Sequence, residues 1–440
     1  MLRITMASVL TGVMAGLVGG AFRWCLAHAE LKRDAMIAWS HGRPYVGWIV
    51  PMVVALVAVT LARYLVVRFA PGASGSGIHR VEAVMVREIE PGSNKVLPVK
   101  FLGGLLSLGA GMALGREGPT VQMGASLAHI IAPRLVRGEE DQRVVLAAGA
   151  GAGLAVAFNA PIGGSVFVFE ELTTSFTPRL LLATLSCATF AVAVVRWMLG
   201  SSSVFFVLPG VPSPGSVNWF FLLLGGLLGL AGALYNSLSL MLLDVTERLS
   251  RYPAVLRAGV IGALVGLVAW FAPAVVGSGD TLTQSILSGK VPMHALGLVF
   301  VIRFFLGPWS YAAGTPGGMF APLLLLGAAF GGFYAGTMQH FAPNLGISIV
   351  DFAIVGMVAL FAASVRAPLT GIVLAIEMTG RGDLTLGMLA AALGAMLVAM
   401  LMKSPPIYQS LRERMLVEER RHSDAVAAVP GSAGSRGRAL

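Results

Sequence analysis

The chain has 440 residues, of which 56% are hydrophobic and only 12% are charged. Soluble domains carry about 25% charged residues, so this composition excludes an ordinary soluble protein and predicts an all-α polytopic membrane protein in a lipid bilayer. The net charge of +10 does not indicate nucleic-acid binding, because no basic stripe interleaved with aromatic residues occurs in a polar segment. Long uncharged runs support membrane spans: 144–169, 217–243, 304–350 and 384–402.

The first membrane helix is predicted from about residue 4 to residue 29, where small residues recur in an apolar segment. No small-residue cleavage site follows it, so we expect this helix to be retained. The charged residues 32–34 predict a turn, and residues 46–67 predict a second helix. Cys25 and Cys187 stand alone in apolar runs, so we expect neither a metal site nor a cofactor.

Residues 71–78, Pro-Gly-Ala-Ser-Gly-Ser-Gly-Ile, contain too much glycine for the interior of a helix. They predict a loop that leads into a short helix. The Ser76 hydroxyl in this loop can either cap that helix or donate a hydrogen bond to a ligand. The residues alone leave both interpretations open.

A second glycine-rich motif, Gly-Arg-Glu-Gly-Pro at 115–119, follows an apolar run over 101–114, and a helix predicted over about 97–114 leads into it. Pro119 suits the first turn of a helix, predicted over 119–131, and the N–H groups at its start form a natural anion site. Glu117 is itself an anion, and a carboxylate at membrane depth costs about 2.5–3.5 kcal/mol. Glu117 is therefore the leading functional candidate; the alternative is a capping carboxylate in a surface loop.

A further helix is predicted to begin at Pro161, after an alanine- and glycine-rich run that ends near Phe158, and to close on Glu170 and Glu171. Two adjacent side chains on a helix point about 100° apart. At most one of these carboxylates therefore faces a buried site. We expect the other to lie at a solvated helix end.

The second half of the chain repeats the first, with halves predicted at about 30–215 and 216–420. The matched pairs are Lys100 with Arg303, Gly111 with Gly314, Gly115 with Gly318, Pro119 with Pro322, Gly124 with Gly327, Ala160-Pro161 with Ala367-Pro368, Gly164 with Gly371, and Glu170 with Glu377. Two copies of a helix start broken by glycine and proline indicate a transporter built from internal repeats. The second copy, at 317–322, repeats the anion-site pattern but carries no acid.

A final amphipathic helix is predicted over 407–421, and its second residue is Tyr408. The phenol either points into the protein or lies in an interfacial aromatic belt. Lysine and arginine gather near this end of the chain, which predicts a cytoplasmic C-terminus. Residues 423–440 lack apolar bulk and are predicted to be a disordered cytoplasmic tail.

Four motifs in this order resemble the CLC family of chloride channels and chloride/proton antiporters: 75–78, 115–119, 318–322, and Tyr408 in the last helix. The resemblance extends over about residues 10–420. It implies inverted repeats of many tilted and broken helices within a single transport domain, 1–422. It also implies a homodimer with one ion pathway per subunit, in a bacterial-type inner membrane with both termini cytoplasmic.

The resemblance also implies roles for individual residues. Ser76 and Tyr408 would coordinate a central chloride through their hydroxyls. Met319 and Phe320 would offer it their backbone N–H groups, and Arg116 and Gly118 would complete the chloride-binding set. Glu117 matches the gating glutamate, and Glu171 matches the inner proton-transfer glutamate that is present in antiporters and missing from channels.

The predicted function is therefore a proton-coupled chloride antiporter, with chloride and protons as its substrates; the alternative is a passive chloride channel. A membrane-embedded enzyme is disfavoured, because the seven histidines show no paired metal-binding spacing and no Gly-x-Ser-x-Gly motif occurs. One departure is His79, which stands where the family usually has proline. It could titrate near neutral pH, or simply lie in the first turn of its helix facing solvent or a neighbour.

Overall fold

The computed structural model describes residues 1–43, 45–201, 204–207 and 218–427. Within these ranges eight helices are long and apolar enough to cross a membrane, which confirms the predicted fold class. The helices are α1 (Leu2–His41), α2 (Ile49–Phe69), α3 (Ile78–Met85), α4 (Val96–Gly109), α5 (Glu117–Leu135), α6 (Glu139–Phe158), α7 (Pro161–Phe167), α8 (Pro178–Leu199), α9 (Asn218–Arg248), α10 (Ala254–Phe271), α11 (Asp280–Leu287), α12 (Met293–Ala312), α13 (Phe320–Phe341), α14 (Ile349–Val365), α15 (Pro368–Thr379), α16 (Thr385–Leu401) and α17 (Ile407–Ala427).

Helix α1 runs without interruption through the charged residues 32–34, so the turn predicted there is wrong. No glycine or proline occurs between Ala21 and His41, and residues with good helix propensity carry the helix onward. The helix before the motif at 115–119 is shorter than predicted, because α4 ends at Gly109 rather than near residue 114. Gly111 has φ of 100°, a conformation that ends a helix.

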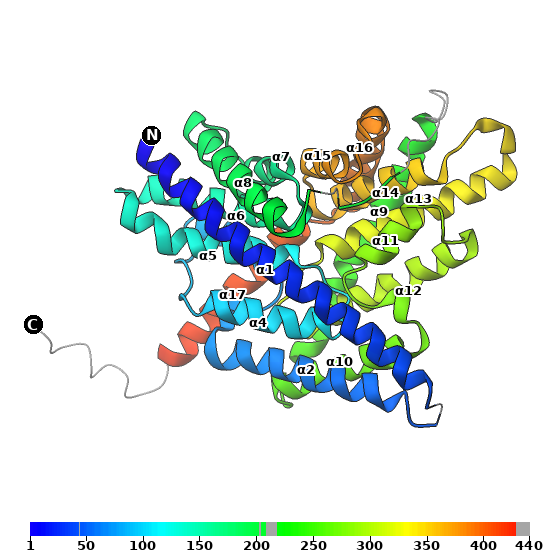
Figure 1. Cartoon of the computed structure of the whole chain (residues 1–440), viewed down its shortest axis with the longest axis horizontal. Helices are drawn as coiled ribbons and strands as arrows, with labels where there is room; N and C mark the ends of the chain where they lie inside the picture. The colour runs from blue at the N-terminus through cyan, green and yellow to red at the C-terminus, as the bar shows by residue number, and fades with distance from the viewer. Residues whose placement is uncertain (44, 202–203, 208–217, 428–440) are drawn as a thin grey trace, which may run out of the picture.

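The elements α1 to α8 recur in the same order as α9 to α16, and the short 3₁₀ turn Pro71–Ala73 recurs as Pro273–Val275. The first copy thus begins with α1, earlier than the predicted boundary near residue 30. The copies pack on each other through matched elements: α2 contacts α10, and α7 contacts α15 (Figure 1).

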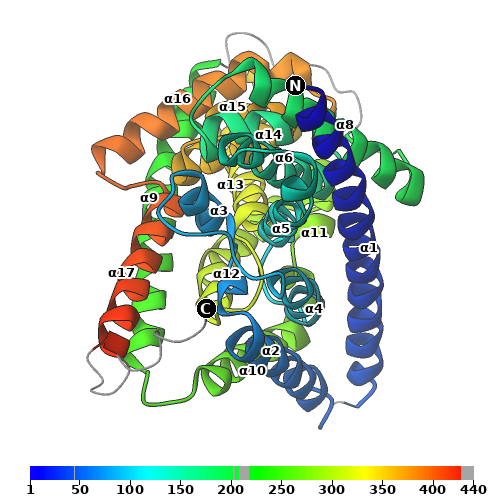
Figure 2. The same ribbon diagram turned by 90° about the vertical axis from the view of Figure 1, so that its left-hand side faces the viewer.

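Helices α5, α6, α13 and α14 form the buried centre of the molecule (Figure 2). Glycine permits α5 to pack closely against α6, and α13 against α14. A Cβ on Gly124 of α5 would overlap the carbonyl oxygen of Gly149 in α6, and the matched Gly327 of α13 meets Gly356 of α14 in the same way. Helices in lipid associate closely through such small residues.

A reciprocal pair of caps joins the two copies. The Glu170 carboxylate accepts the N–H groups of Leu369 (3.0 Å) and Thr370 (2.6 Å) at the start of α15. The matched Glu377 accepts those of Ile162 (3.2 Å) and Gly163 (2.6 Å) at the start of α7. The expectation that one of the two adjacent carboxylates lies at a solvated helix end is therefore wrong for Glu170, because it satisfies a helix N-terminus in the other copy.

The last helix, α17, lies alongside α9 at the edge of the molecule (Figure 2). Arg414 on α17 forms ion pairs with Asp244 and Glu247 of α9, and Glu419 pairs with Arg80 of α3. The helix continues to Ala427, past the point where the sequence predicts the disordered tail to begin; residues 428–440 lie outside the described part.

Candidate anion site

The two glycine-rich motifs meet in the middle of the molecule. Gly115 donates a hydrogen bond to the carbonyl of Gly318 (2.7 Å), and Gly318 donates one back to Gly115 (2.8 Å), in an antiparallel bridge. Because these residues are matched in the repeat, the mutual exchange places an approximate two-fold axis between them. The N-termini of α5 and α13, each with a positive dipole end, therefore lie next to each other.

Glu117 is the first residue of α5 and is fully buried. Its Oε2 accepts the N–H of Ala321 (3.4 Å), in the first turn of α13, and Oε1 has no partner among the described residues. A Cβ on Gly115 would overlap this carboxylate, which explains the glycine there. A carboxylate from one copy thus lies at the helix start of the other copy, in the place predicted for an anion.

The backbone at the start of α13 keeps two free donors. Met319 is the N-cap and Phe320 the first helical residue, and both are buried. Within the described ranges neither N–H has a hydrogen-bond acceptor. The Phe320 ring packs against those of Phe158 (5.0 Å between centroids) and Phe361 (4.3 Å), so apolar side chains surround these donors.

Ser76 and Tyr408 contribute two buried hydroxyls that have no hydrogen-bond partner in the described chain. Gly77, rather than Ser76, is the N-cap of α3, and no side chain caps that helix; the capping interpretation of Ser76 is therefore wrong. A Cβ on Gly118 would overlap the Ser76 hydroxyl, so Ser76 lies directly against the start of α5. Tyr408 is fully buried, which excludes a place in an exposed interfacial belt.

The Arg116 side chain forms an ion pair with Asp280 (3.1 Å). Asp280 ends a second Gly-Ser-Gly loop, at 277–279, which corresponds to residues 75–77. Buried cations support both loops: Lys100 donates to the carbonyls of Ala73 and Gly75, and the matched Arg303 donates to those of Val276 and Gly277. The matching of the two halves in the sequence did not include this second loop, although residues 75–77 and 277–279 are both Gly-Ser-Gly and lie 202 positions apart.

Glu171 lies on the short π-helical turn Val168–Leu172 after α7, and its carboxyl group lies beside that of Glu82 on α3. Two neighbouring carboxyl groups disfavour a second negative charge, so such a pair can take up a proton readily. Arg412 of α17 lies 3.9 Å from Glu82. The sequence analysis did not predict Glu82 as a functional residue. Its one indication in the sequence is that it is an acid in a short helix directly after the Ser76 loop.

An inner cavity of about 560 Å³ reaches the Ser76 loop between α3, α9, α10, α12 and α17. His79 lines it from the first turn of α3. Burial, with Lys100 and Arg80 nearby, lowers the pKa of His79 to about 3. The expectation of titration near neutral pH is therefore wrong, and the placement in the first turn is confirmed.

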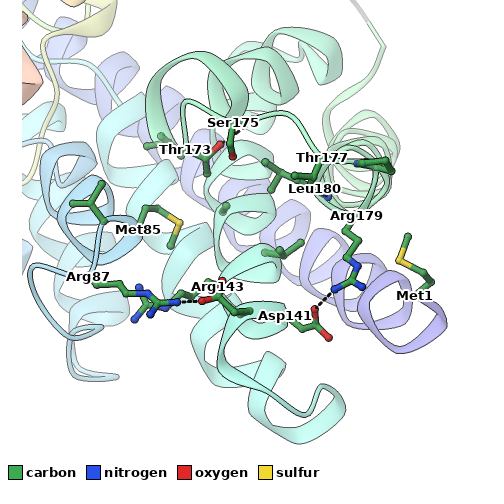
Figure 3. Close-up of a pocket in the computed structure, with 16 residues that line it drawn as sticks. Met1, Met85, Arg87, Asp141, Arg143, Thr173, Ser175, Thr177, Arg179 and Leu180 are labelled. Carbon is green, nitrogen blue, oxygen red and sulfur yellow. Dashed lines mark hydrogen bonds and ion pairs between the residues drawn. The ribbon is translucent and has the colours of Figure 1, made fainter.

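A second cavity, of about 770 Å³, lies between α6, α8 and the π-helical turn (Figure 3). Arg179 and Asp141 form an ion pair across it (3.6 Å). No residue of the four motifs lines this cavity, although Leu172, the neighbour of Glu171, does.

Comparison with known proteins agrees with this geometry. The model of the "Voltage gated chloride channel" family matches residues 58–400. The chain is 38% identical to the H(+)/Cl(-) exchange transporter ClcA of Cronobacter sakazakii over 435 residues, which covers 97% of this chain and 92% of that protein. It is 39% identical to ClcA of Vibrio cholerae serotype O1 over 420 residues, with 94% and 90% covered.

Solved structures give the same result. A slow cyanobacterial Cl⁻/H⁺ antiporter has a TM-score of 0.89 and 32% identity, with 95% of this chain and 99% of that chain covered. A eukaryotic CLC transporter has a TM-score of 0.78 at 23% identity, covering 93% of this chain and 74% of that one, and supports the fold alone. From its motifs, its repeated halves and these relatives together, the chain is a member of the voltage-gated chloride channel (CLC) family.

Proposed function

We propose that this protein is an antiporter that exchanges chloride for protons, and that Glu117 gates the pathway. The observation that carries the proposal is the Glu117 carboxylate on the N–H of Ala321, at the start of α13. The same helix start has free N–H groups at Met319 and Phe320, so the carboxylate and a chloride ion are alternative occupants of one electropositive place.

Competition for that place couples the two ions. A protonated Glu117 is neutral and gives way to chloride, and a bound chloride in turn disfavours the ionised carboxylate. Proton binding and chloride binding therefore favour each other, and this linkage is reciprocal. Ser76 and Tyr408 hold the ion one step further in through their unpaired hydroxyls, with Arg116 and Gly118 at the start of α5 beside it.

The inner end of the proton path is the carboxyl pair of Glu171 and Glu82. A proton taken up by this pair gives a donor and acceptor separate from the chloride path, which a passive channel does not need. The names of the relatives, which are H(+)/Cl(-) exchange transporters, support exchange over passive conduction.

We further infer a homodimer with one pathway per subunit in a bacterial-type inner membrane, with both termini in the cytoplasm. The resemblance to the CLC family and the basic residues near the C-terminus support this arrangement. Crosslinking in native membranes tests the dimer, and protease access from either side tests the orientation.

The test of function is purified protein in sealed proteoliposomes. An imposed chloride gradient is expected to drive protons against their own gradient, in the direction opposite to chloride. Chloride flux without any proton movement would instead identify a passive channel. Absence of both fluxes would refute the whole proposal.

A further inference from the structure

Tyr311 is a buried phenol near the end of α12 that none of the four motifs includes. Its side chain lines the inner cavity. The Ser76 N–H donates to its hydroxyl oxygen over 3.4 Å, and a Cβ on Gly75 would come within 2.9 Å of that oxygen. The phenol therefore lies between the inner cavity and the loop that carries Ser76.

The Tyr311 hydroxyl accepts this hydrogen bond, but its own proton has no acceptor in the described part of the chain. A phenol has one proton to donate, and leaving a buried donor unpaired is costly. The hydroxyl of the adjacent Ser76 has no hydrogen-bond partner in the described chain either. The Tyr311 phenol and the Ser76 hydroxyl therefore offer two buried donors, beside each other, for which the described chain supplies no acceptor.

The charges that line the cavity favour an anion at this end. Arg63 donates to Ser74 (3.1 Å) and to the carbonyl of Gly314 (2.6 Å), and neither Arg63 nor Arg257 has a carboxylate within ion-pair distance among the described residues. At the α17 end, by contrast, Arg80 and Arg414 are paired with acids. Two guanidinium groups without a carboxylate at ion-pair distance in the described ranges therefore line the same cavity as the Tyr311 phenol, which favours an anion there.

We propose that Tyr311 is a further anion-binding residue, whose hydroxyl donates to a chloride ion at the cavity end of the pathway, before Ser76 and Tyr408. Arg63 and Arg257 attract the ion to this position, and the phenol supplies a directional donor. The ligand is a small monovalent anion, because one neutral hydroxyl in a cavity lined by two guanidinium groups without a carboxylate partner in the described chain suits a single negative charge. The inference rests on the proposed chloride pathway and adds a residue to it.

The test is Tyr311→Phe, which keeps the ring and removes the hydroxyl. Calorimetric titration of the purified protein with chloride is expected to show about tenfold weaker binding, as for loss of a hydrogen bond to a charged group. The matched control is Tyr235→Phe. The Tyr235 hydroxyl is also buried and unpaired in the described chain, and it packs against Gly307 of the same helix, but it does not line the inner cavity. Chloride binding by this control is expected to equal that of the wild type.

Chloride binding by Tyr311→Phe that equals or exceeds that of the control would overturn the inference. Bromide-soaked crystals of the wild type give a second test that needs no variant. Anomalous density within hydrogen-bond distance of the Tyr311 hydroxyl supports the assignment, and density confined to Ser76 and Tyr408 contradicts it. If the wild type neither binds nor moves chloride, the proposed function itself fails, which is a separate result.

Discussion

The Arg116 guanidinium lies 3.1 Å from the Asp280 carboxylate, so the residue next to Glu117 is paired with an acid from the other copy of the repeat. Both side chains are largely buried, with 16% and 24% of their surface exposed. The negative charge of Asp280 partly cancels the positive charge of Arg116, which would otherwise act on Glu117 without compensation. Asp280 therefore influences how readily Glu117 takes up a proton, although the two carboxylates belong to different halves.

Replacing Asp280 with asparagine removes a negative charge near Glu117 and leaves Arg116 without its partner. Both effects make protonation of Glu117 harder. The pH at which proton-coupled flux is half-maximal is expected to fall by about one unit. Flux measured across a pH series checks this, with Asp34→Asn as control because Asp34 pairs with Arg33 instead. An unchanged or higher midpoint would contradict the electrostatic role of Asp280.

Glu117→Gln replaces the carboxylate with a neutral amide of nearly the same size. The amide carries no proton and does not compete as an anion for the start of α13. Proton movement is expected to fall to background, whereas chloride flux continues and loses its pH dependence. Simultaneous chloride and pH recordings on proteoliposomes measure both. Retained proton coupling would remove Glu117 from the gate.

Glu171→Gln breaks the carboxyl pair with Glu82 but leaves the anion site intact. Chloride flux is therefore expected to persist while proton transport is lost. The matched control is Glu139→Gln, an exposed acid that pairs with Arg143 on its own helix. If Glu171→Gln keeps the coupling ratio of the wild type, the inner proton path lies elsewhere.

His79→Gln is expected to leave the pH profile of flux unchanged. With its pKa lowered to about 3, the imidazole is already neutral throughout the range above pH 4. A histidine with a lowered pKa adds no charge as pH falls from 8 to 5, so its removal changes no charge there. A shifted midpoint in this variant, measured beside Glu117→Gln, would show that His79 does titrate.

Glu377→Gln weakens one of the two reciprocal caps. The amide keeps one acceptor oxygen for the N–H groups of Ile162 and Gly163 and loses the charge that favours a helix N-terminus. The free energy of unfolding is expected to fall by about 1 kcal/mol, measured by thermal or detergent unfolding. Glu90→Gln, in an exposed loop, serves as control; an equal effect in both variants would argue against the cap.

The sequence predicted the parts of the site that depend on backbone. The glycines and prolines at 115–119 and 318–322 report directly on broken helix starts, and their matched spacing identified the repeat. Side-chain partners across the two copies were not predictable in this way. Glu170 illustrates the limit, since its acceptors on α15 lie 199 and 200 residues away in the chain.

Other residues were missed for different physical reasons. Tyr311 and Glu82 belong to no repeated pattern, and only their contacts with Ser76 and Glu171 reveal them. Asp280 could have been found, because its Gly-Ser-Gly loop is a second copy of the Ser76 loop. The predicted end of α1 is too early, because the charged residues 32–34 do not interrupt a helix that contains no glycine or proline there.

The bridge between Gly115 and Gly318 has an evolutionary consequence. Neither half holds the whole proposed anion site, since one supplies Ser76 and Glu117 and the other supplies Met319 and Phe320. A single-copy ancestor could have built this pathway only from two separate polypeptides meeting about the same axis.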